Sequence, residues 1–216
     1  MNTISYLKNI YGYDTPILLK DIRIGRKSKA AIKQELYLAT KRGDIKRKYN
    51  GVYYFSNDDV EIPLGISFES VLEKKFIADN WGVEGFEIFN TYGYYSGLTF
   101  INMIGLSEQV PAIIEITTNK TSCNKRIYTQ KGTPLKAIIR KSKIEITGQN
   151  YKMLQFLEMF YYLTNEEVIK GRAIITNYIK KCGFTKHDLD KYMDALSFEV
   201  FEKLAMGGLL NVFIWK

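Results

Sequence analysis

The dipeptide Asn50-Gly51 lies between two short runs that have the composition of β-strands. Lys-Arg-Lys-Tyr (46–49) comes before it and Val-Tyr-Tyr-Phe (52–55) follows it. An Asn-Gly pair in this setting favours a tight turn in which both central residues have positive φ, and it is the strongest short-range signal for a β-hairpin. The sequence therefore predicts a hairpin over 46–55.

Two longer helices are predicted before this hairpin. The first covers 3–11 and ends at Gly12. The second begins after Ser28, a residue type that caps helix N-termini well, and runs to Arg42 before Gly43. Both helices therefore have a glycine as their stop signal.

A short helix is expected between them. Thr15 can cap it, and Pro16 then occupies the first helical position, where proline is favoured. This helix would bury Leu18, Leu19 and Ile22. Three helices followed by a hairpin predict a winged helix-turn-helix.

The helix after Ser28 has two distinct faces. Ile32, Leu36 and Ala39 are spaced four and three residues apart and form an apolar stripe. The opposite face presents Lys27, Ala30, Gln34, Tyr37 and Lys41, flanked by Lys29 and Lys33. Such a face suits the major groove, because lysines can contact phosphates or guanine and Gln34 can pair with adenine.

Positive charge is concentrated in this first segment. Residues 1–55 carry 12 Lys and Arg against 4 Asp and Glu, whereas the remaining residues carry 19 of each. A basic module of this kind indicates a polyanionic partner, most commonly nucleic acid. The residues expected at the DNA are Arg26, Lys27, Lys29, Lys33, Gln34, Lys46, Arg47, Lys48 and Tyr49.

Two alternatives stay open for this surface. The lysines could form a solvated helix face with no partner, as most charge runs do. RNA is another possible partner, although a reading helix fits the B-form major groove better than the deep, narrow groove of an RNA duplex. We therefore expect residues 1–60 to form a DNA-binding domain.

Residues 61–216 are expected to form a larger mixed domain, so the predicted fold class is α+β. Acidic residues and a proline within 58–63 mark the boundary. Helices are expected over 67–80, 97–104 and 149–163, and strands at 112–118, 125–130, 134–141 and 144–147. The tail from about 165 is expected to be helical: one helix ends at Lys180-Lys181 before Gly183, a capping box joins Thr185 and Asp188, a helix covers 198–205, and 209–215 is apolar.

The order of several segments resembles the AbiEi-type antitoxins of bacterial toxin–antitoxin and phage abortive-infection systems. These segments are "GDIKRKYNGVYYF", "PLG", "YYSGLTFINMIGLSEQVP", a strand ending near "TNK", and "IEITGQNYKMLQFLE", and the resemblance covers about residues 1–160. It implies a cytoplasmic autorepressor that binds inverted repeats in its own promoter. It also implies a C-terminal domain that counteracts a cognate nucleotidyltransferase-like toxin, in some cases without a stable complex. The positions of the antitoxic pattern that match best are Ser96 and Gln109, where packing is the simpler interpretation.

Nothing in the sequence indicates catalysis, a metal site or a cofactor. His187 is the only histidine, and it is expected among charged residues in the solvated first turn of a helix, which argues against Ser-His-Asp chemistry and histidine-based metal sites. A nuclease core would need an Asp on one strand and Glu-x-Lys on the next, and the nearest candidates are Asp79 and Glu115, with Thr117 in the place of the lysine. Another alternative is a ligand-responsive repressor whose aromatic-rich centre forms an effector pocket.

The sequence also indicates the cellular compartment of the protein. Cys123 and Cys182 are isolated thiols, which is typical of a reducing cytosol. The N-terminus lacks the pattern of a signal peptide. The uncharged stretch 88–107 has about the length of a membrane span, but its polar residues and glycines favour a buried position in a protein that does not cross the membrane.

Overall fold

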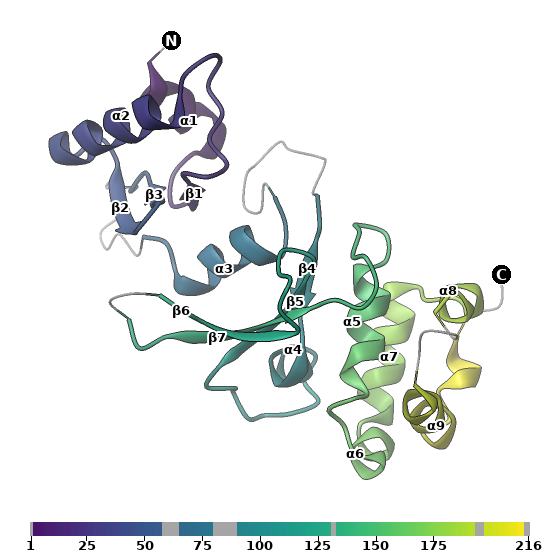
Figure 1. Ribbon diagram of the computed structural model, residues 1–216. Helices are drawn as coiled ribbons and strands as arrows, with labels where there is room; N and C mark the ends of the chain where they lie inside the picture. Colours follow the sequence, from purple (N-terminus) through teal and green to yellow (C-terminus); the bar gives the residue numbers. More distant parts are fainter. Residues whose placement is uncertain (1, 58–64, 80–89, 131–132, 193–196, 214–216) are drawn as a thin grey trace. The chain divides into compact units, whose positions relative to one another are not determined.

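The computed structural model describes residues 2–57, 65–79, 90–130, 133–192 and 197–213 (Figure 1). The protein is mixed α and β, and its contacts divide it into two compact units. Unit 1 contains Met1–Asn90 with Gln130–Leu135, and unit 2 contains Thr91–Thr129 with Lys136–Lys216. Segment 58–64, where the sequence places a domain boundary, lies outside the described residues, so that boundary stays a prediction.

Unit 1 combines helices with a small antiparallel sheet whose strand order is β1-β3-β2. Its elements are α1 (Thr3–Tyr11), β1 (Ile17–Leu18), α2 (Lys29–Arg42), β2 (Lys46–Tyr49), β3 (Val52–Tyr54) and α3 (Phe68–Phe76). The hydroxyl of Ser28 accepts a hydrogen bond from the Ala31 N–H, and Gly43 follows α2 with a φ of +84°. The predicted cap and stop of this helix are therefore confirmed.

The predicted apolar stripe of α2 is confirmed as well. Ile32, Leu36 and Ala39 are buried, and they pack in one core with Leu7 of α1 and Tyr53 of β3. Because only this stripe is apolar, α2 turns one face to the core and leaves its polar face to solvent.

The hairpin is confirmed, but its turn differs from the expected one. Gly51 has a φ of +73°, whereas Asp14 is the one non-glycine with positive φ in the described part of the chain. Asn50 therefore does not have the conformation expected of it. The pairing register shifts between Arg47 and Tyr49, and this irregularity accommodates the different turn.

The prediction of a short helix that begins at Pro16 is wrong. Ile17 and Leu18 form strand β1 instead, and they pair with Tyr53 and Val52 of β3. Thr-Pro favours an extended backbone as well as a helix start, because proline disfavours the α conformation of the residue before it. Pairing with β3 and complete burial decide for the strand.

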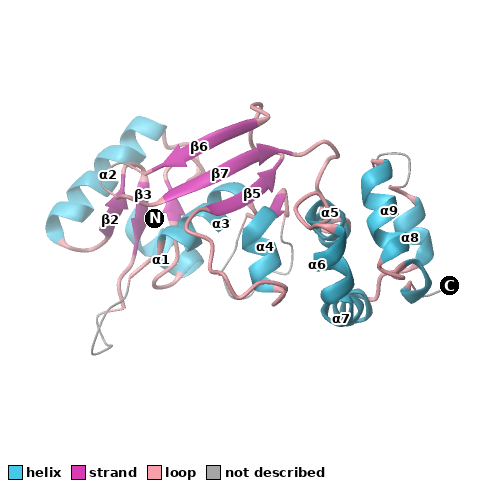
Figure 2. Ribbon diagram, turned by 90° about the horizontal axis from the view of Figure 1, so that it is seen from below, coloured by secondary structure: helices cyan, strands magenta, loops and turns pink. Residues whose placement is uncertain are grey.

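Unit 2 contains a four-stranded sheet with the order β4-β5-β7-β6. Strands β5 and β7 are parallel, and the other neighbours are antiparallel. In Figure 2 β5, β7 and β6 lie side by side, and helices α5 to α9 gather at one side of the sheet. The bounds are β4 (Gly93–Tyr95), α4 (Gly97–Met103), β5 (Ile114–Thr118), β6 (Lys125–Thr129) and β7 (Lys136–Lys141).

The strands of this unit differ from the prediction in two places. Strand β4, which the sequence did not predict, pairs with β5. The strand expected at 144–147 does not form, because the Asn119 side chain takes the place of a neighbouring strand. Its amide donates to the Ile146 carbonyl at 2.8 Å, and its oxygen accepts from the Ile146 N–H at 3.1 Å.

Helices form the rest of unit 2. The helix expected to end at Lys180-Lys181 is divided into two helices at Gly171. A Cβ atom on Gly171 would come within 2.3 Å of a Leu106 methyl carbon. The capping box of Thr185 and Asp188 is confirmed. The bounds are α5 (Tyr151–Met159), α6 (Asn165–Lys170), α7 (Arg172–Cys182), α8 (Lys186–Asp190), α9 (Phe198–Met206) and the 3-10 helix η2 (Leu210–Val212).

The main core of unit 2 lies among these helices. Phe156 of α5 and Phe160, directly after this helix, are fully buried. The core also contains Ile175 of α7, Leu204 of α9 and Phe213. The apolar C-terminal segment is thus docked in the core as far as Phe213, and 214–216 lie outside the described residues. No helix in the described ranges combines the length and the apolar character needed to cross a membrane.

Candidate functional site

Helix α2 presents most of the predicted DNA-contacting residues to solvent. Arg26 precedes the helix, and Lys29, Lys33 and Gln34 lie on it; all four are exposed. Tyr37 is half exposed, and the Lys41 ammonium lies 4.8 Å from the centre of its ring. The structure thus brings basic and amide side chains together on one side of one helix.

Lys27 differs from the other predicted basic residues. Its ammonium lies 2.8 Å from Glu35 Oε1 and donates to the Thr3 hydroxyl at 2.9 Å. The hydrogen bond from Lys27 is the main cause that lowers the pKa of Glu35. Because Thr3 belongs to α1 and Glu35 to α2, Lys27 joins the two helices.

The hairpin contributes the second basic group. Lys46, Arg47 and Lys48 are exposed, and Tyr49 is partly buried. The Arg47 guanidinium donates to the Asn50 side-chain oxygen at 2.7 Å, so this residue braces the turn.

The two residues taken from the antitoxin resemblance lie in different environments. Gln109 is exposed in the loop after α4. Ser96 is only 2 % exposed, and its hydroxyl lies 3.0 Å from that of Thr117. Ser96 therefore packs inside unit 2.

The sequence did not predict a polar cluster in unit 2, in which Tyr94 and Thr117 are buried and Glu158 is partly buried. The carboxylate of Glu158 on α5 accepts a hydrogen bond from the Tyr94 hydroxyl of β4 at 2.8 Å and another from the Thr117 hydroxyl of β5 at 2.9 Å. Its members are far apart in the chain, and the apolar residues of the helix that carries Glu158 predict only a packing role for that helix. The packing of α5 against β4 and β5 brings them together.

Burial controls the ionisation of this cluster. It raises the pKa of Glu158, against the hydrogen bonds from Tyr94 and Thr117, and it raises the pKa of Tyr162 to about 12. The pKa of Tyr94 also rises well above its usual value, first through burial and then through the charge of Glu158. Perturbed groups of this kind gather at functional sites more often than elsewhere.

An ion pair lies next to the cluster. Arg140 of β7 donates to the Glu115 carboxylate of β5 at 2.8 Å, and Glu115 is buried. Gly97 approaches the same carboxylate so closely that a Cβ would lie 2.7 Å from Glu115 Cδ. The Glu115 side chain therefore binds β7 through Arg140 and lies directly against the start of α4.

The cluster and the ion pair border a cavity of about 460 Å³ within unit 2. This volume lies in the range of small-molecule sites, about 300–1,000 Å³. Tyrosines and aliphatic side chains share its lining with charged groups. The residues are Tyr94, Thr117, Asn124, Arg140, Lys141, Ser142, Lys143, Ile144, Leu154, Leu157, Glu158, Tyr161, Tyr162 and Tyr192.

The nuclease alternative gains no support from this geometry. Glu115 is engaged by Arg140, and Asp79 lies in a turn just after α3 rather than in the helix expected for it. Across the residues that the structure describes, no three His, Cys, Asp or Glu side chains come together as a metal site.

No family model, no curated protein and no solved structure matches this chain. The functional interpretation therefore depends on the geometry of α2, the hairpin and the cavity, together with the sequence resemblance described above.

Proposed function

We propose that this protein is a DNA-binding antitoxin that represses its own operon. Unit 1 acts as a module similar to a winged helix, in which strand β1 stands in the place of the predicted second helix. Helix α2 enters the major groove, and the basic hairpin lies on the adjacent backbone or minor groove. The observation that carries the proposal is the exposed polar face of α2, with Lys29, Lys33 and Gln34, beside a hairpin with three exposed basic residues. The partner is double-stranded operator DNA, and paired copies of the chain would match an inverted repeat.

The antitoxin half of the proposal depends on the sequence resemblance. Unit 2 would counteract a nucleotidyltransferase-like toxin encoded nearby, and Gln109 is the exposed residue of the matching pattern. No catalytic residue, metal or cofactor enters this function, and it places the protein in the cytoplasm.

The test is fluorescence anisotropy of the full chain on duplex DNA from directly upstream of its own gene. A scrambled duplex of equal composition is the control. We expect tighter binding to the upstream duplex, and Lys33→Gln to weaken it, whereas Lys180→Gln, an exposed charge change on α7, leaves it unchanged. Equal weak binding to both duplexes would contradict the repressor.

A separate experiment tests the antitoxin. The neighbouring gene is expressed with and without this chain, and growth is measured. Rescue of growth by the Lys33→Gln variant would show that the protective function is independent of DNA binding. Failure of the parent chain to protect would contradict the antitoxin half alone.

A further inference from the structure

The cavity of unit 2 has basic residues at one side. Lys141 and Lys143 follow each other closely at the end of β7 and are exposed. The Lys143 ammonium lies 5.6 Å from the ring centre of Tyr161. Arg140 is held by Glu115, and these two lysines are the exposed cationic residues of the lining. Lysines in this setting suit an anionic group such as a phosphate.

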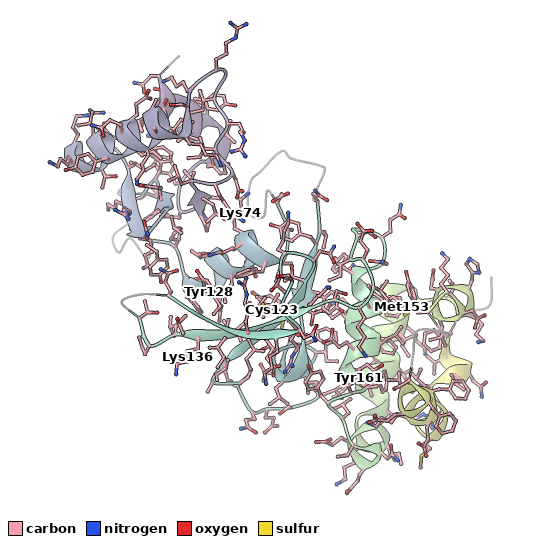
Figure 3. All side chains as sticks on the ribbon, viewed as in Figure 1. Lys74, Cys123, Tyr128, Lys136, Met153 and Tyr161 are labelled. Atoms are coloured by element: carbon pink, nitrogen blue, oxygen red, sulfur yellow. The ribbon has the colours of Figure 1, made fainter. Side chains whose placement is uncertain are left out.

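The walls of the cavity are aromatic and aliphatic. Tyr161 and Tyr162 lie in the turn that follows α5, Tyr192 follows α8, and Leu154 and Leu157 add apolar surface from α5. Figure 3 shows Tyr161 beside α5 on the side of the sheet where these helices gather. A flat ring can stack on such tyrosines and bury its faces there.

Hydrogen-bonding groups complete the lining. The two bonds from Tyr94 and Thr117 use part of the acceptor capacity of Glu158, because a carboxylate has about four lone-pair positions. Glu158 can therefore still accept from N–H groups of a ligand. Asn124, also in the lining, offers both a donor and an acceptor.

We propose that this cavity binds a nucleoside monophosphate, with the base against the tyrosines, its polar edge toward Glu158 and its phosphate on Lys141 and Lys143. The three kinds of lining match the three parts of such a ligand. An unsubstituted aromatic acid would leave the remaining acceptor positions of Glu158 unused, and inorganic phosphate would leave the apolar walls without a partner. This site is independent of the DNA-binding surface of unit 1.

Isothermal titration calorimetry of the full chain tests the proposal. AMP, GMP, CMP and UMP are titrated in turn up to about 1 mM, with the matching nucleosides and inorganic phosphate as partial ligands. At least one monophosphate should bind, and its nucleoside and phosphate alone should each bind at least about tenfold more weakly. Absence of binding by all four monophosphates, or phosphate binding as tightly as any of them, would overturn the proposal.

Surface variants test the orientation without disturbing the core. The double variant Lys141→Gln, Lys143→Gln should weaken binding about tenfold or more. Lys136→Gln is the matched control: it removes a lysine from the same strand, and Figure 3 shows this residue at the end of β7 away from α5. If the control weakens binding as much as the double variant, the phosphate position is wrong.

Discussion

The Tyr94 hydroxyl donates a 2.8 Å hydrogen bond to the Glu158 carboxylate, joining strand β4 to helix α5 across 64 residues of sequence. Thr117 holds the other carboxylate oxygen at 2.9 Å, so both oxygens have a partner. This partly buried acid is therefore part of the structure of unit 2 as well as of its cavity.

The stability of the protein should depend on pH through Glu158. Its pKa is raised in the folded state, mainly by burial, so the folded chain holds this proton more tightly than the unfolded chain does. The resulting stabilisation is complete below the unfolded pKa of about 4.3 and is lost as the pH rises through the folded pKa. Glu158→Gln should therefore become more stable relative to the parent as pH rises from about 4 to about 8.

Urea unfolding at a series of pH values measures this difference. Glu166→Gln, which changes an exposed carboxylate on α6, is the control and should follow the parent at every pH. A constant difference between Glu158→Gln and the parent would contradict the raised pKa.

Replacement of Gly97 should destabilise unit 2 strongly. Its φ is +56°, and an added Cβ would lie 2.7 Å from the buried Glu115 carboxyl. We expect Gly97→Ala to cost about 2–4 kcal/mol, because steric conflict adds to the strain of a left-handed alanine. Gly105→Ala is the matched control, since Gly105 has a φ of +80° with open space around it, and it should cost about 1 kcal/mol. Equal midpoints in thermal unfolding would exclude the close contact.

The conformation of the loop at 144–147 should depend on the side chain of Asn119. Replacing this residue by alanine removes the partners of both backbone groups of Ile146 and should cost about 1–2 kcal/mol. Asn119→Asp can still accept from the Ile146 N–H but cannot donate to its carbonyl. The stability of this variant should therefore lie between that of the alanine variant and that of the parent. Hydrogen exchange at the Ile146 amide, which should accelerate in the alanine variant, is the direct readout.

DNA binding should separate residues that read bases from those that hold phosphates. Gln34→Ala should relax the preference at one base pair, at a cost of about 1–3 kcal/mol for the preferred sequence. Lys33→Gln and Lys46→Gln should weaken all sequences about equally and reduce the salt slope, expected near −5 to −7 for about six to eight phosphate contacts. An unchanged binding profile for Gln34→Ala would mean that a different face of α2 meets the bases.

Replacement of Lys27 should affect DNA binding less than replacement of the neighbouring basic residues. Because its ammonium is engaged by Glu35 and Thr3, Lys27→Gln should change the salt slope of DNA binding less than Lys33→Gln does. It should also lower the free energy of unfolding slightly, by less than about 1 kcal/mol, since the pair is partly exposed. A salt slope reduced as much as in Lys33→Gln would place Lys27 on the DNA.

Elements with local signals could be predicted from the amino-acid sequence alone. Ser28 and Gly43 bound α2, the spacing of Ile32, Leu36 and Ala39 selects its buried face, and Asn50-Gly51 marks the hairpin. Caps, turns and apolar periodicity act within a few residues, so they can be read without knowledge of the fold. The exposed basic face of α2 follows from the same periodicity.

Whether the other segments form strands depends on contacts with residues far along the chain. Ile17 and Leu18 become a strand because β3 offers them hydrogen bonds, and 144–147 fails to become one because Asn119 occupies its backbone groups. The cavity is of the same kind, since Glu158 meets Tyr94 and Thr117 only after β4, β5 and α5 have packed. Local preferences of such segments are weak and balanced, and pairing, burial and hydrogen bonding to residues far along the chain determine the outcome.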